Sequence, residues 1–533
     1  MIFPFRKSLL FLDPVFLRTP SFMSDATFSP LIQRMLQPEF YPHSVQTPIQ
    51  LLQTHISYIL LTGDYAYKVK KPLDFGFLNY STLEKRKHFC AEELRLNQRA
   101  AADIYVDSLP ITQQGEQFHL DGEGEAVEYT VKMCQFPQDE LLSRMFAEGR
   151  LTEALLRDLA IAIADFHKQA TTNDYIRSFG QAAAVREAFD ENYAQTEAYI
   201  GGPQTQKQFD ETQAYTDRFF EEQQALFQQR IDQDWIRECH GDLHLGNICV
   251  WNNRLYLFDC IEFNEPFRFV DVMFDIAYIV MDLEVGDRPD LSALFLSTYV
   301  EQTGDWKGLE VLPIYVSRQT YVRAKVTSFL LSDPSVSEAE KAEISKKAAN
   351  YYTLAWKYTQ PKKGRLVLMA GLSGSGKSTT ARSLSKQLGA VQVRSDAVRK
   401  HLAGIPLSQK GDDSLYTPEM SQKTYDELLA IGIRLAETGY SIILDAKYDR
   451  VGVRQAAIAQ ARQHQIPIDI VYCDAPEEVR RDRLQQRSGD IADATAALVS
   501  QQRFDSFTEE ERPHVLTLDT TKELDPQLKE WMS

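Results

Sequence analysis

A short stretch of the chain, CHGDLHLGNICVW (residues 239–251), combines two histidines, an aspartate and an asparagine. Imidazole and carboxylate groups at this density suit either a zinc site or a loop that transfers phosphate. His240 and His244 would supply two zinc ligands in a helix, but Gly241 and Gly246 favour a loop. No further Cys or His stands at metal-ligand spacing in the sequence, so the pattern favours phosphate transfer.

The same stretch matches the catalytic-loop pattern H-x-D-x-x-x-x-N with His240, Asp242 and Asn247. In this pattern the aspartate takes the proton of an acceptor hydroxyl, and the asparagine binds Mg²⁺. A second metal-binding aspartate is expected after a short β-hairpin, and Asp259 stands at the predicted strand end in RLYLFDCIEF. We therefore predict Asp242 as general base and Asn247 and Asp259 as Mg²⁺ ligands.

This chemistry also requires a strand lysine and a helical glutamate further upstream. Lys68 in YAYKVKK and Glu93 in FCAEELRL stand in this order, and the spacing leaves Lys70 and Glu92 open as alternatives. The preceding text, TPIQLLQTHISYILLTG, contains no G-x-G-x-x-G loop to cover the phosphates. The missing loop keeps a second hypothesis open, in which this part binds ATP as a regulator with little turnover.

These features resemble the aminoglycoside phosphotransferase and choline-kinase-like branch of the protein-kinase-like fold, over about residues 30–330. HGDLHLGN matches that branch's H-G-D-x-H-x-x-N, and FRFVDVMFDIAY resembles its D-x-x-x-D-[IL]-A segment, in which Asp275 is expected to be structural. The resemblance implies a two-lobed domain that transfers phosphate from Mg-ATP to a hydroxyl of a small molecule. Gly241 stands where protein kinases carry an arginine that reads a phosphorylated loop, which argues against that regulation.

A second set of candidate residues lies in GLSGSGKST, which matches G-x-x-x-x-G-K-[ST]. The match follows the predicted strand RLVLMA and opens the predicted helix KSTTARSLSKQL, as a phosphate-binding loop must. Catalytic Lys377 is expected to reach the β- and γ-phosphates, and Ser378 to bind Mg²⁺. The predicted nucleotide-binding residues are Gly371, Leu372, Ser373, Gly374, Ser375, Gly376, Lys377, Ser378 and Thr379.

Charged residues follow the next predicted strands. Asp396 comes directly after VQVR and is predicted as the base for a second acceptor, with a helix cap as its alternative role. Arg399, one helical turn further on, suits a substrate anion. Asp445 ends the strand SIILD and is predicted to lie in the Mg²⁺ shell. Arg483 and Arg487 in EEVRRDRLQQR are predicted to close over the γ-phosphate.

This second half resembles the small P-loop kinases of the zeta-toxin, polynucleotide-kinase and gluconate-kinase-like group, over about residues 364–520. The resemblance rests on GLSGSGKST, RSDAVRK and RRDRLQQR, and implies a kinase rather than a motor or GTPase. A 5′-hydroxyl nucleotide kinase is an alternative, although a net charge of -17 argues against long nucleic acids as partners. Both halves together resemble bacterial bifunctional aminoglycoside phosphotransferase/ATP-binding proteins, a likeness that does not fix either acceptor.

Hydrophobic patterns predict the elements that must position these residues. HISYILLTG and YAYKVKKP read as strands that meet in a hairpin at Gly63 and Asp64, and EYTVKMCQF as a further strand. STLEKRKHFCAEELRLNQRAA reads as a helix with Ser81 as its N-cap. Helical patterns then dominate up to about residue 330, so a small β-rich lobe precedes a larger helical lobe.

In the second half, LVLMA, VQVR, SIILD, DIVYC and VLTLD alternate with helical segments, which predicts a parallel α/β sheet. The predicted fold class is therefore an α+β, protein-kinase-like domain followed by an α/β P-loop domain. The predicted boundaries are a disordered extension at 1–22, with Met23 as an alternative start, domains at 23–335 and 364–533, and a helical linker at 336–363.

Length and composition limit the number of domains, the state of the cysteines and the kinds of partner that can be expected. A chain of 533 residues is expected to form two or three domains, and six cysteines without a C-x-x-C pair fit reduced thiols in the cytoplasm. The sequence contains no run of 18 apolar residues, so no membrane partner is expected. The expected ligands are ATP, Mg²⁺ and small-molecule acceptors.

Overall fold

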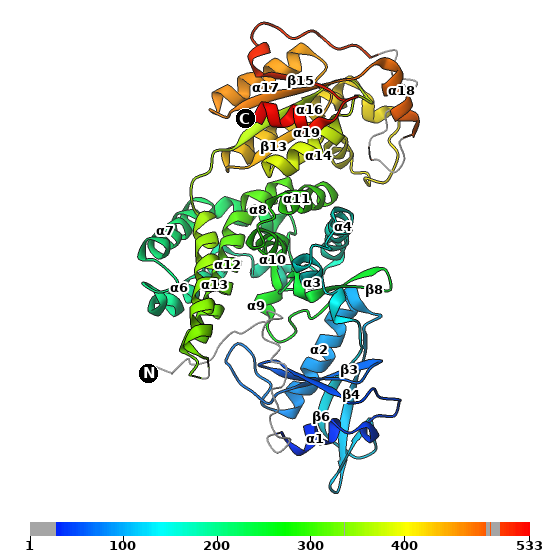
Figure 1. Ribbon diagram of the computed structural model, residues 1–533, viewed down its shortest axis with the longest axis vertical. Helices are drawn as coiled ribbons and strands as arrows, with labels where there is room; N and C mark the ends of the chain where they lie inside the picture. Colours follow the sequence, from blue (N-terminus) through cyan, green and yellow to red (C-terminus); the bar gives the residue numbers. More distant parts are fainter. Residues whose placement is uncertain (1–27, 335, 487–490, 492–501, 533) are drawn as a thin grey trace. The chain divides into compact units, whose positions relative to one another are not determined.

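The computed structural model describes residues 28–334, 336–486, 491 and 502–532 (Figure 1). The predicted extension at 1–22, the alternative start Met23 and the predicted phosphate ligand Arg487 lie outside these residues. Within the described residues, no helix is long and apolar enough to span a bilayer.

The chain forms two compact units whose segments alternate along the sequence. Unit 1 comprises Met1–Leu151, Gln169–Asp282 and Ile314–Lys357, and unit 2 comprises Thr152–Lys168, Leu283–Pro313 and Tyr358–Ser533. Two helices from the first two-thirds of the chain, α4 (Glu153–Gln169) and α11 (Pro289–Thr303), therefore belong almost entirely to unit 2. The predicted boundaries of 1–22, 23–335, 336–363 and 364–533 stay predictions.

Unit 1 contains a six-stranded antiparallel sheet in the order β1-β2-β3-β6-β4-β5. The hairpin predicted at Gly63 and Asp64 is confirmed, because β2 and β3 pair directly across this turn and Gly63 has a φ of 107°. The strands are β1 (Gln50–Gln53), β2 (Ser57–Leu61), β3 (Tyr65–Lys70), β4 (Tyr105–Gln114), β5 (Gln117–Leu120) and β6 (Glu125–Cys134).

Helix α2 (Leu83–Ala101) covers this sheet and carries Glu93. Its inner face shares an apolar core with the sheet, in which Cys90 packs among Tyr105 and Val131. The prediction of Ser81 as N-cap is wrong. The cap is Thr82, whose side chain accepts the N–H of Lys85 at 3.3 Å, because the Ser81 hydroxyl donates to Asn79 at 2.7 Å instead.

The rest of unit 1 is mainly helical, with two short antiparallel pairs, β7 (Ile236–Glu238) with β10 (Phe269–Asp271) and β8 (Ile248–Trp251) with β9 (Arg254–Leu257). The predicted linker contains helix α13 (Glu338–Lys357), which packs on α7 and belongs to unit 1. The helices are α1 (Pro30–Met35), α2, α3 (Leu142–Ala147), α5 (Asp174–Ser178), α6 (Ala182–Thr196), α7 (Gln206–Glu222), α8 (Gln224–Asp232), α9 (Glu265–Arg268), α10 (Val272–Val285), α12 (Leu312–Phe329) and α13.

Unit 2 is built on a five-stranded parallel sheet in the order β12-β13-β11-β14-β15. Its strands are β11 (Arg365–Ala370), β12 (Val391–Arg394), β13 (Ser441–Asp445), β14 (Ile468–Asp474) and β15 (Val515–Asp519). Its later helices are α14 (Lys377–Leu388), α15 (Ser395–Leu402), α16 (Pro418–Glu437), α17 (Val451–Gln463), α18 (Glu477–Gln486) and α19 (Leu524–Met532).

Helices cover both faces of this sheet. Val367 and Met369 of the central strand β11 pack with α14 and α19, whereas Leu366 on the opposite face lies against Gly432 of α16. Successive side chains of a strand point to opposite faces, so a strand buried on both sides reads as an unbroken apolar run. The five strands predicted in this half are confirmed, as is the predicted fold class of an α+β and an α/β part.

Candidate active sites

Strand β3 and helix α2 bring two lysines to one glutamate. Lys68 Nζ lies 2.8 Å from Glu93 Oε1, and Lys70 Nζ lies 2.5 Å from Glu93 Oε2. Both lysines point to the same side of β3 because they are two residues apart. Glu92, the other predicted alternative, is directed away and pairs with Arg95 at 2.9 Å.

The two lysines differ in their second partner. Lys68 Nζ also lies 2.6 Å from Asp259 Oδ1 and faces a cavity, whereas Lys70 is buried and pairs with Glu262. Tyr80 donates its hydroxyl hydrogen to the same carboxylate of Glu262. Lys68 therefore stands beside the predicted metal ligand, and Lys70 stands behind it in the protein interior.

Charge in this cluster is balanced by pairing. Burial lowers the pKa of Lys68, but the carboxylates of Asp259 and Glu93 more than offset this, so its pKa lies well above the ordinary value. Burial raises the pKa of Glu93, but Lys68 and Lys70 together hold that pKa below its ordinary value. Both side chains are therefore ionised at neutral pH.

Asp259 lies two residues beyond the end of β9, not at its last residue as predicted. Its φ of 65° turns the chain sharply, and its N–H donates to the Tyr105 hydroxyl at 3.2 Å. The next N–H, of Cys260, donates to Asn97 Oδ1 of α2 at 2.9 Å. Helix α2 thus positions both the Lys68–Glu93 pair and the loop that carries Asp259.

The catalytic-loop stretch folds as a turn with one short 3₁₀ segment, as its glycines indicate. Asn247 Nδ2 donates to the backbone oxygen of Asp242 at 3.0 Å and lies 3.4 Å from Asp242 Oδ2. His244 Nε2 also lies 3.4 Å from Asp242 Oδ2. Burial raises the pKa of Asp242, but the hydrogen bond from His244 and the charge of Arg323 help to lower it more, which keeps the carboxylate ionised.

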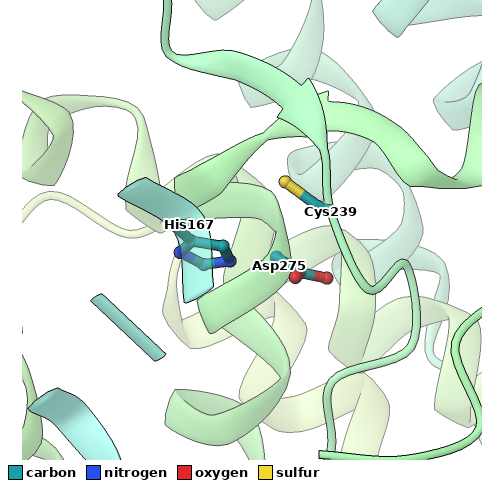
Figure 2. Close-up of side chains that lie close together, drawn as sticks. All are labelled: His167, Cys239 and Asp275. Carbon is teal, nitrogen blue, oxygen red and sulfur yellow. The ribbon is translucent and has the colours of Figure 1, made fainter. Parts of the chain in front are cut away.

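Asp275 of α10 fixes the turn at the start of this loop. Its carboxylate accepts the N–H of His240 at 3.0 Å and the N–H of Gly241 at 2.8 Å. Figure 2 shows Asp275 beside the loop that follows Cys239. Gly241 has a φ of 87°, and a Cβ there would lie 2.7 Å from the carbonyl oxygen of Phe267. These contacts are those expected of a structural aspartate.

The histidines of the stretch are engaged by the backbone rather than arranged around a metal. His240 Nε2 donates to the Phe258 carbonyl at 2.9 Å, while its Nδ1 accepts the N–H of Asp242 at 3.3 Å. His244 Nδ1 accepts the N–H of Gly246 at 3.0 Å. Three of the four ring nitrogens therefore have backbone partners, which does not suit a zinc site.

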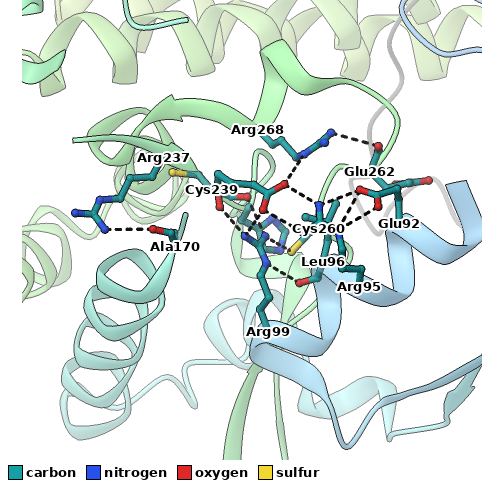
Figure 3. Close-up of polar contacts among 12 residues, drawn as sticks. Glu92, Arg95, Leu96, Arg99, Ala170, Arg237, Cys239, Cys260, Glu262 and Arg268 are labelled. Atoms are coloured by element: carbon teal, nitrogen blue, oxygen red, sulfur yellow. Dashed lines mark hydrogen bonds and ion pairs between the residues drawn. The ribbon is translucent and has the colours of Figure 1, made fainter. Parts of the chain in front are cut away.

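An arginine network that the sequence did not reveal ties α2 to the start of the loop (Figure 3). Arg95 Nη2 lies 2.7 Å from Glu238 Oε1, and Arg268 Nε lies 3.3 Å from the same oxygen. Arg99 donates to the carbonyl oxygens of Glu238 and Cys239 at 2.6 and 3.2 Å. Arg95 and Arg99 lie 139–143 residues from the groups they contact, and Arg268 lies 30 residues from Glu238, so local spacing carries no signal for these pairs.

A cavity of about 1140 Å³ brings the predicted residues of unit 1 together. The predicted base, both predicted metal ligands and the predicted lysine line it: Asp242, Asn247, Asp259 and Lys68. One wall is apolar and is formed by Leu52, Ile59, Leu61, Ala66, Met133 and Phe258. Gln195, Tyr199, Phe329, Ser332 and Asp333 from the mainly helical part of unit 1 also line it.

The β1–β2 turn forms part of the lining of this cavity. Thr54, His55 and Ile56 connect these antiparallel strands and line the cavity. Thr54 Oγ1 accepts the N–H of Ser57 at 2.9 Å and the N–H of Ile56 at 3.3 Å. A threonine side chain therefore organises a turn that the sequence did not predict, because the turn carries no glycine.

In unit 2, the predicted phosphate-binding loop runs from β11 to the first turn of α14. Gly371, Gly374 and Gly376 have φ values of 135°, 80° and 93°. A Cβ at Gly374 would lie 2.5 Å from the Arg480 carbonyl oxygen. The glycines are therefore required both by backbone conformation and by the close approach of α18.

The predicted catalytic and metal residues of this loop lie in one cavity of about 1580 Å³, together with Asp396 and Asp445. Lys377 begins α14 and its Nζ donates to the Leu372 carbonyl oxygen at 2.9 Å. Burial lowers the pKa of Lys377, although Asp445 opposes this shift. Asp445 ends β13, as predicted, and its Oδ2 accepts from Gln392 Nε2 at 2.8 Å.

Arg483 holds the end of β15 against the loop. Its guanidinium donates to the Thr520 hydroxyl and carbonyl oxygens at 3.0 and 2.7 Å, and lies 3.4 Å from the Gly374 carbonyl oxygen. Arg399 is 7% exposed, donates to the Leu415 carbonyl oxygen at 2.9 Å, and has no described partner for its Nε. Arg399 and Asp396 line the same cavity.

Helices α4 and α11 form part of the same cavity through Arg157, Ser297 and Glu301. The Ser297 hydroxyl accepts the N–H of Gln392 at 3.0 Å, and Glu301 lies 3.6 Å from Arg394, two residues before Asp396. The sequence prediction placed both helices only in the first domain. Their contribution here depends on tertiary packing, which a local pattern does not record.

The geometry thus defines a chain with one unit that combines an antiparallel sheet with helices around the Lys68–Glu93–Asp259 cluster, and a second unit with a glycine-rich loop on a parallel sheet. The model of an AAA domain matches residues 366–509. Uncharacterized proteins from Mycobacterium tuberculosis (strain ATCC 25618 / H37Rv) and Mycobacterium bovis (strain ATCC BAA-935 / AF2122/97) are each 30% identical over 464 residues. These alignments cover 86% of this chain and 90% of each relative, and the chain belongs to the family of these proteins.

Solved structures match the two parts of the chain separately. An amicoumacin kinase in complex with AMP-PNP, Ca²⁺ and its ligand is 14% identical, with 61% of this chain and 92% of that chain covered and a TM-score of 0.39. The APS kinase CysC of Mycobacterium tuberculosis in complex with AMPPNP and APS is 21% identical, with 32% and 97% covered and a TM-score of 0.24.

Proposed function

We propose that unit 1 transfers the γ-phosphoryl group of ATP to a hydroxyl group of a small molecule. The observation that carries this proposal is the meeting of Lys68, Asp242, Asn247 and Asp259 in one cavity. These side chains come from three separate parts of the sequence. A phosphotransferase needs a cation for the phosphates, oxygen ligands for Mg²⁺ and a base for the acceptor, and this set supplies all three.

The donor set fits Mg²⁺, which prefers carboxylate and carbonyl oxygens. Asn247 donates through Nδ2 to Asp242, which leaves its amide oxygen for the metal together with the carboxylate of Asp259. Bound Mg-ATP supplies the phosphoryl group and a metal ion that neutralises charge on the phosphates. Lys68 stays ionised beside Asp259 and is the cation available to a nucleotide phosphate.

Asp242 is assigned as the base. The contacts with His244 and Asn247 both use its Oδ2, which leaves Oδ1 to take the proton of the acceptor hydroxyl. As that proton moves to Asp242, the hydroxyl oxygen forms the bond to phosphorus and ADP leaves. The apolar wall of Leu52, Ile59 and Ala66 suits an adenine ring.

The charges of the residues that line this cavity also limit the chemical class of the acceptor. Among the described residues that line this cavity, Lys68 is the single lysine or arginine, while Asp333 and Tyr199 also line it. An acceptor that carries its own phosphate or carboxylate would meet no second cation there. We therefore infer that the acceptor of unit 1 is a neutral or amine-bearing alcohol.

The test compares two substitutions in the full chain carrying Lys377→Ala, which removes the contribution of unit 2. Asp242→Asn should leave the Kd for Mg-ATP nearly unchanged but slow phosphate transfer by about 10²–10⁴-fold. Asp259→Asn should raise that Kd by about tenfold or more, because the metal ion neutralises the phosphates. Equal Mg-ATP binding by both variants would remove Asp259 as a metal ligand.

For unit 2 we propose a second, P-loop phosphotransferase activity on an anionic small molecule or nucleotide. Its cavity is lined by Asp396 as the candidate base and by Arg394, Arg399 and Arg450 as candidate anion ligands. The buried guanidinium of Arg399, with its Nε lacking a described partner, favours an anionic acceptor. Arg399→Lys should raise the KM for the acceptor by a larger factor than it raises the Kd for Mg-ATP.

The rival function is a nucleotide-responsive regulator with little turnover. Release of ADP from labelled ATP, measured with acceptor mixtures sorted by charge, separates the two. Single-site variants Asp242→Asn and Lys377→Ala assign any turnover to unit 1 or unit 2. Tight Mg-ATP binding without acceptor-dependent turnover in any mixture would favour the regulator.

A further inference from the structure

A well-anchored segment delivers Gln502 to the phosphate-binding loop of unit 2. Arg454 is fully buried, lies 2.7 Å from the Glu511 carboxylate, and donates to the Asp505 carbonyl oxygen at 3.0 Å. Phe504 packs against Tyr472 of β14, with ring centroids 4.6 Å apart. The chain that follows Gln502 is thus fixed to the sheet by a buried ion pair and an aromatic contact.

Gln502 makes a reciprocal pair of hydrogen bonds with Ser373, the third residue of the loop. The Ser373 N–H donates to Gln502 Oε1 at 2.9 Å, and Gln502 Nε2 donates to the Ser373 hydroxyl at 2.9 Å. The neighbouring residue, Leu372, accepts from Lys377 Nζ at 2.9 Å. The amide of Gln502 and the ammonium of Lys377 therefore contact adjacent residues of the loop, and both face the same cavity.

This placement has a chemical consequence. In a P-loop, the lysine reaches the β- and γ-phosphates, so a donor beside it is at the same end of the nucleotide. A neutral amide can donate to a phosphate oxygen without adding negative charge, whereas a carboxylate of the same shape would repel it. The Ser373 N–H needs an acceptor and a phosphate oxygen needs a donor. The side-chain amide of Gln502 offers an acceptor oxygen and a donor NH₂ group for these two roles.

We propose that Gln502 binds the γ-phosphate of the nucleotide in unit 2. Its Oε1 keeps the N–H of Ser373, and its Nε2 exchanges the Ser373 hydroxyl for a γ-phosphate oxygen. Gln502 thereby distinguishes a nucleoside triphosphate from a diphosphate. This inference rests on the proposed nucleotide site of unit 2 and adds to it the residue that reads the terminal phosphate.

The experiment measures Kd values for Mg-AMPPNP and Mg-ADP by calorimetry on the full chain carrying Asp259→Asn and Lys68→Met, which weaken the site of unit 1. Gln502→Ala should weaken Mg-AMPPNP by about tenfold, as expected for one hydrogen bond to a charged group, and Mg-ADP by less than about twofold. Gln502→Glu should weaken Mg-AMPPNP further, since its charge faces the γ-phosphate.

A matched control is available in the same unit. Gln527 Oε1 also accepts a backbone N–H, that of Asp519 at 3.1 Å, but Gln527 does not line the cavity. Gln527→Ala should change both Kd values by less than about twofold. Equal weakening of both nucleotides by Gln502→Ala would make Gln502 a loop support only and overturn the inference. If the starting protein binds neither nucleotide, the proposed nucleotide site fails, and the inference fails with it.

Discussion

The ammonium group of Lys68 lies 2.6 Å from the Asp259 carboxylate, although 191 residues separate them in sequence. One residue belongs to the antiparallel sheet and the other to a loop after β9. Their contact brings the predicted phosphate cation to the predicted metal ligand. The second lysine, Lys70, shares Glu93 with Lys68 but turns to Glu262 in the interior.

We expect substitutions of these two lysines to have different effects, one on nucleotide binding and the other on stability. Lys68→Met should raise the Kd for Mg-ATP in unit 1 strongly with a small loss of stability, because Lys68 faces the cavity. Lys70→Met should cost about 3–5 kcal/mol of unfolding free energy, since it removes the cation paired with the buried carboxylate of Glu262 and leaves Glu93 with Lys68 alone. Urea unfolding and nucleotide calorimetry on the same samples check this.

A charge-matched double variant sharpens that comparison. Lys70→Met with Glu262→Gln removes one positive and one negative charge and should recover part of the lost stability. The same double change should not restore nucleotide binding to Lys68→Met. Loss of nucleotide affinity in Lys70→Met equal to that in Lys68→Met would contradict separate roles.

A buried lysine in α12 should give unit 1 a distinct pH dependence. Burial lowers the pKa of Lys325 to about 8, and its Nζ donates only to the amide oxygens of Asn192 and Gln195, at 2.6 and 2.9 Å, among its described contacts. An unfolded lysine has a pKa of about 10.4. Between these values the unfolded chain binds the proton and the folded chain does not, so this group adds stability as pH rises.

Lys325→Met removes this contribution. The unfolding free energy of the parent minus that of the variant should therefore increase by about 2 kcal/mol between about pH 7 and pH 9.5. Urea titrations at both pH values, analysed for the transition of unit 1, provide the measurement. A difference that stays constant with pH would show that Lys325 titrates as an ordinary exposed lysine.

Local spacing in the sequence predicted the residues that lie close together along the chain. HGDLHLGN contains the predicted base and a predicted metal ligand, GLSGSGKST contains the whole predicted phosphate-binding loop, and the parallel sheet follows from its apolar runs. Order along the chain pointed to Asp259 and to two pairs of alternatives, Lys68 or Lys70 and Glu93 or Glu92, because the family that the sequence resembles carries a lysine, a glutamate and an aspartate in that order. In the structure, Lys68 contacts both Glu93 and Asp259.

Contacts between distant segments were not predictable in the same way. The sequence left Lys68 and Lys70 open because both are on the same side of β3, and only tertiary contacts separate their partners. The membership of α4 and α11 in unit 2 depends on surface complementarity, and Gln502 stands far from any recognisable motif. Strand β1 is short and its turn lacks glycine, so it gave no hairpin signal.

The buried pair of Arg454 and Glu511 should be essential to the stability of unit 2. Both side chains have no exposed surface, and Arg454 also donates to the Tyr448 carbonyl oxygen at 3.1 Å. Arg454→Met should lower the unfolding free energy of unit 2 by about 3–5 kcal/mol, because the Glu511 charge stays buried. The control is Arg462→Met, which breaks the exposed pair with Glu510 and should cost less than about 1 kcal/mol. Thermal unfolding in both variants provides the comparison.

Asp275 offers a test of how the catalytic loop of unit 1 is held. Each oxygen of its carboxylate accepts one backbone N–H, from His240 and from Gly241. Asp275→Asn keeps the shape, but an amide has one acceptor oxygen, so its NH₂ group must face the other N–H donor. Leaving that buried N–H donor without an acceptor should lower the unfolding free energy by about 1–3 kcal/mol.

The same substitution should also affect activity. Because Asp242 follows Gly241 directly, the displaced turn should slow phosphate transfer. The Kd for Mg-ATP should change little, since Lys68 and Asp259 are held by α2 instead. Transfer rate and Kd measured together in the Lys377→Ala chain separate these effects. A parallel rise in Kd would mean that Asp275 supports the nucleotide site as a whole, and unchanged stability would mean that the two N–H groups find other acceptors.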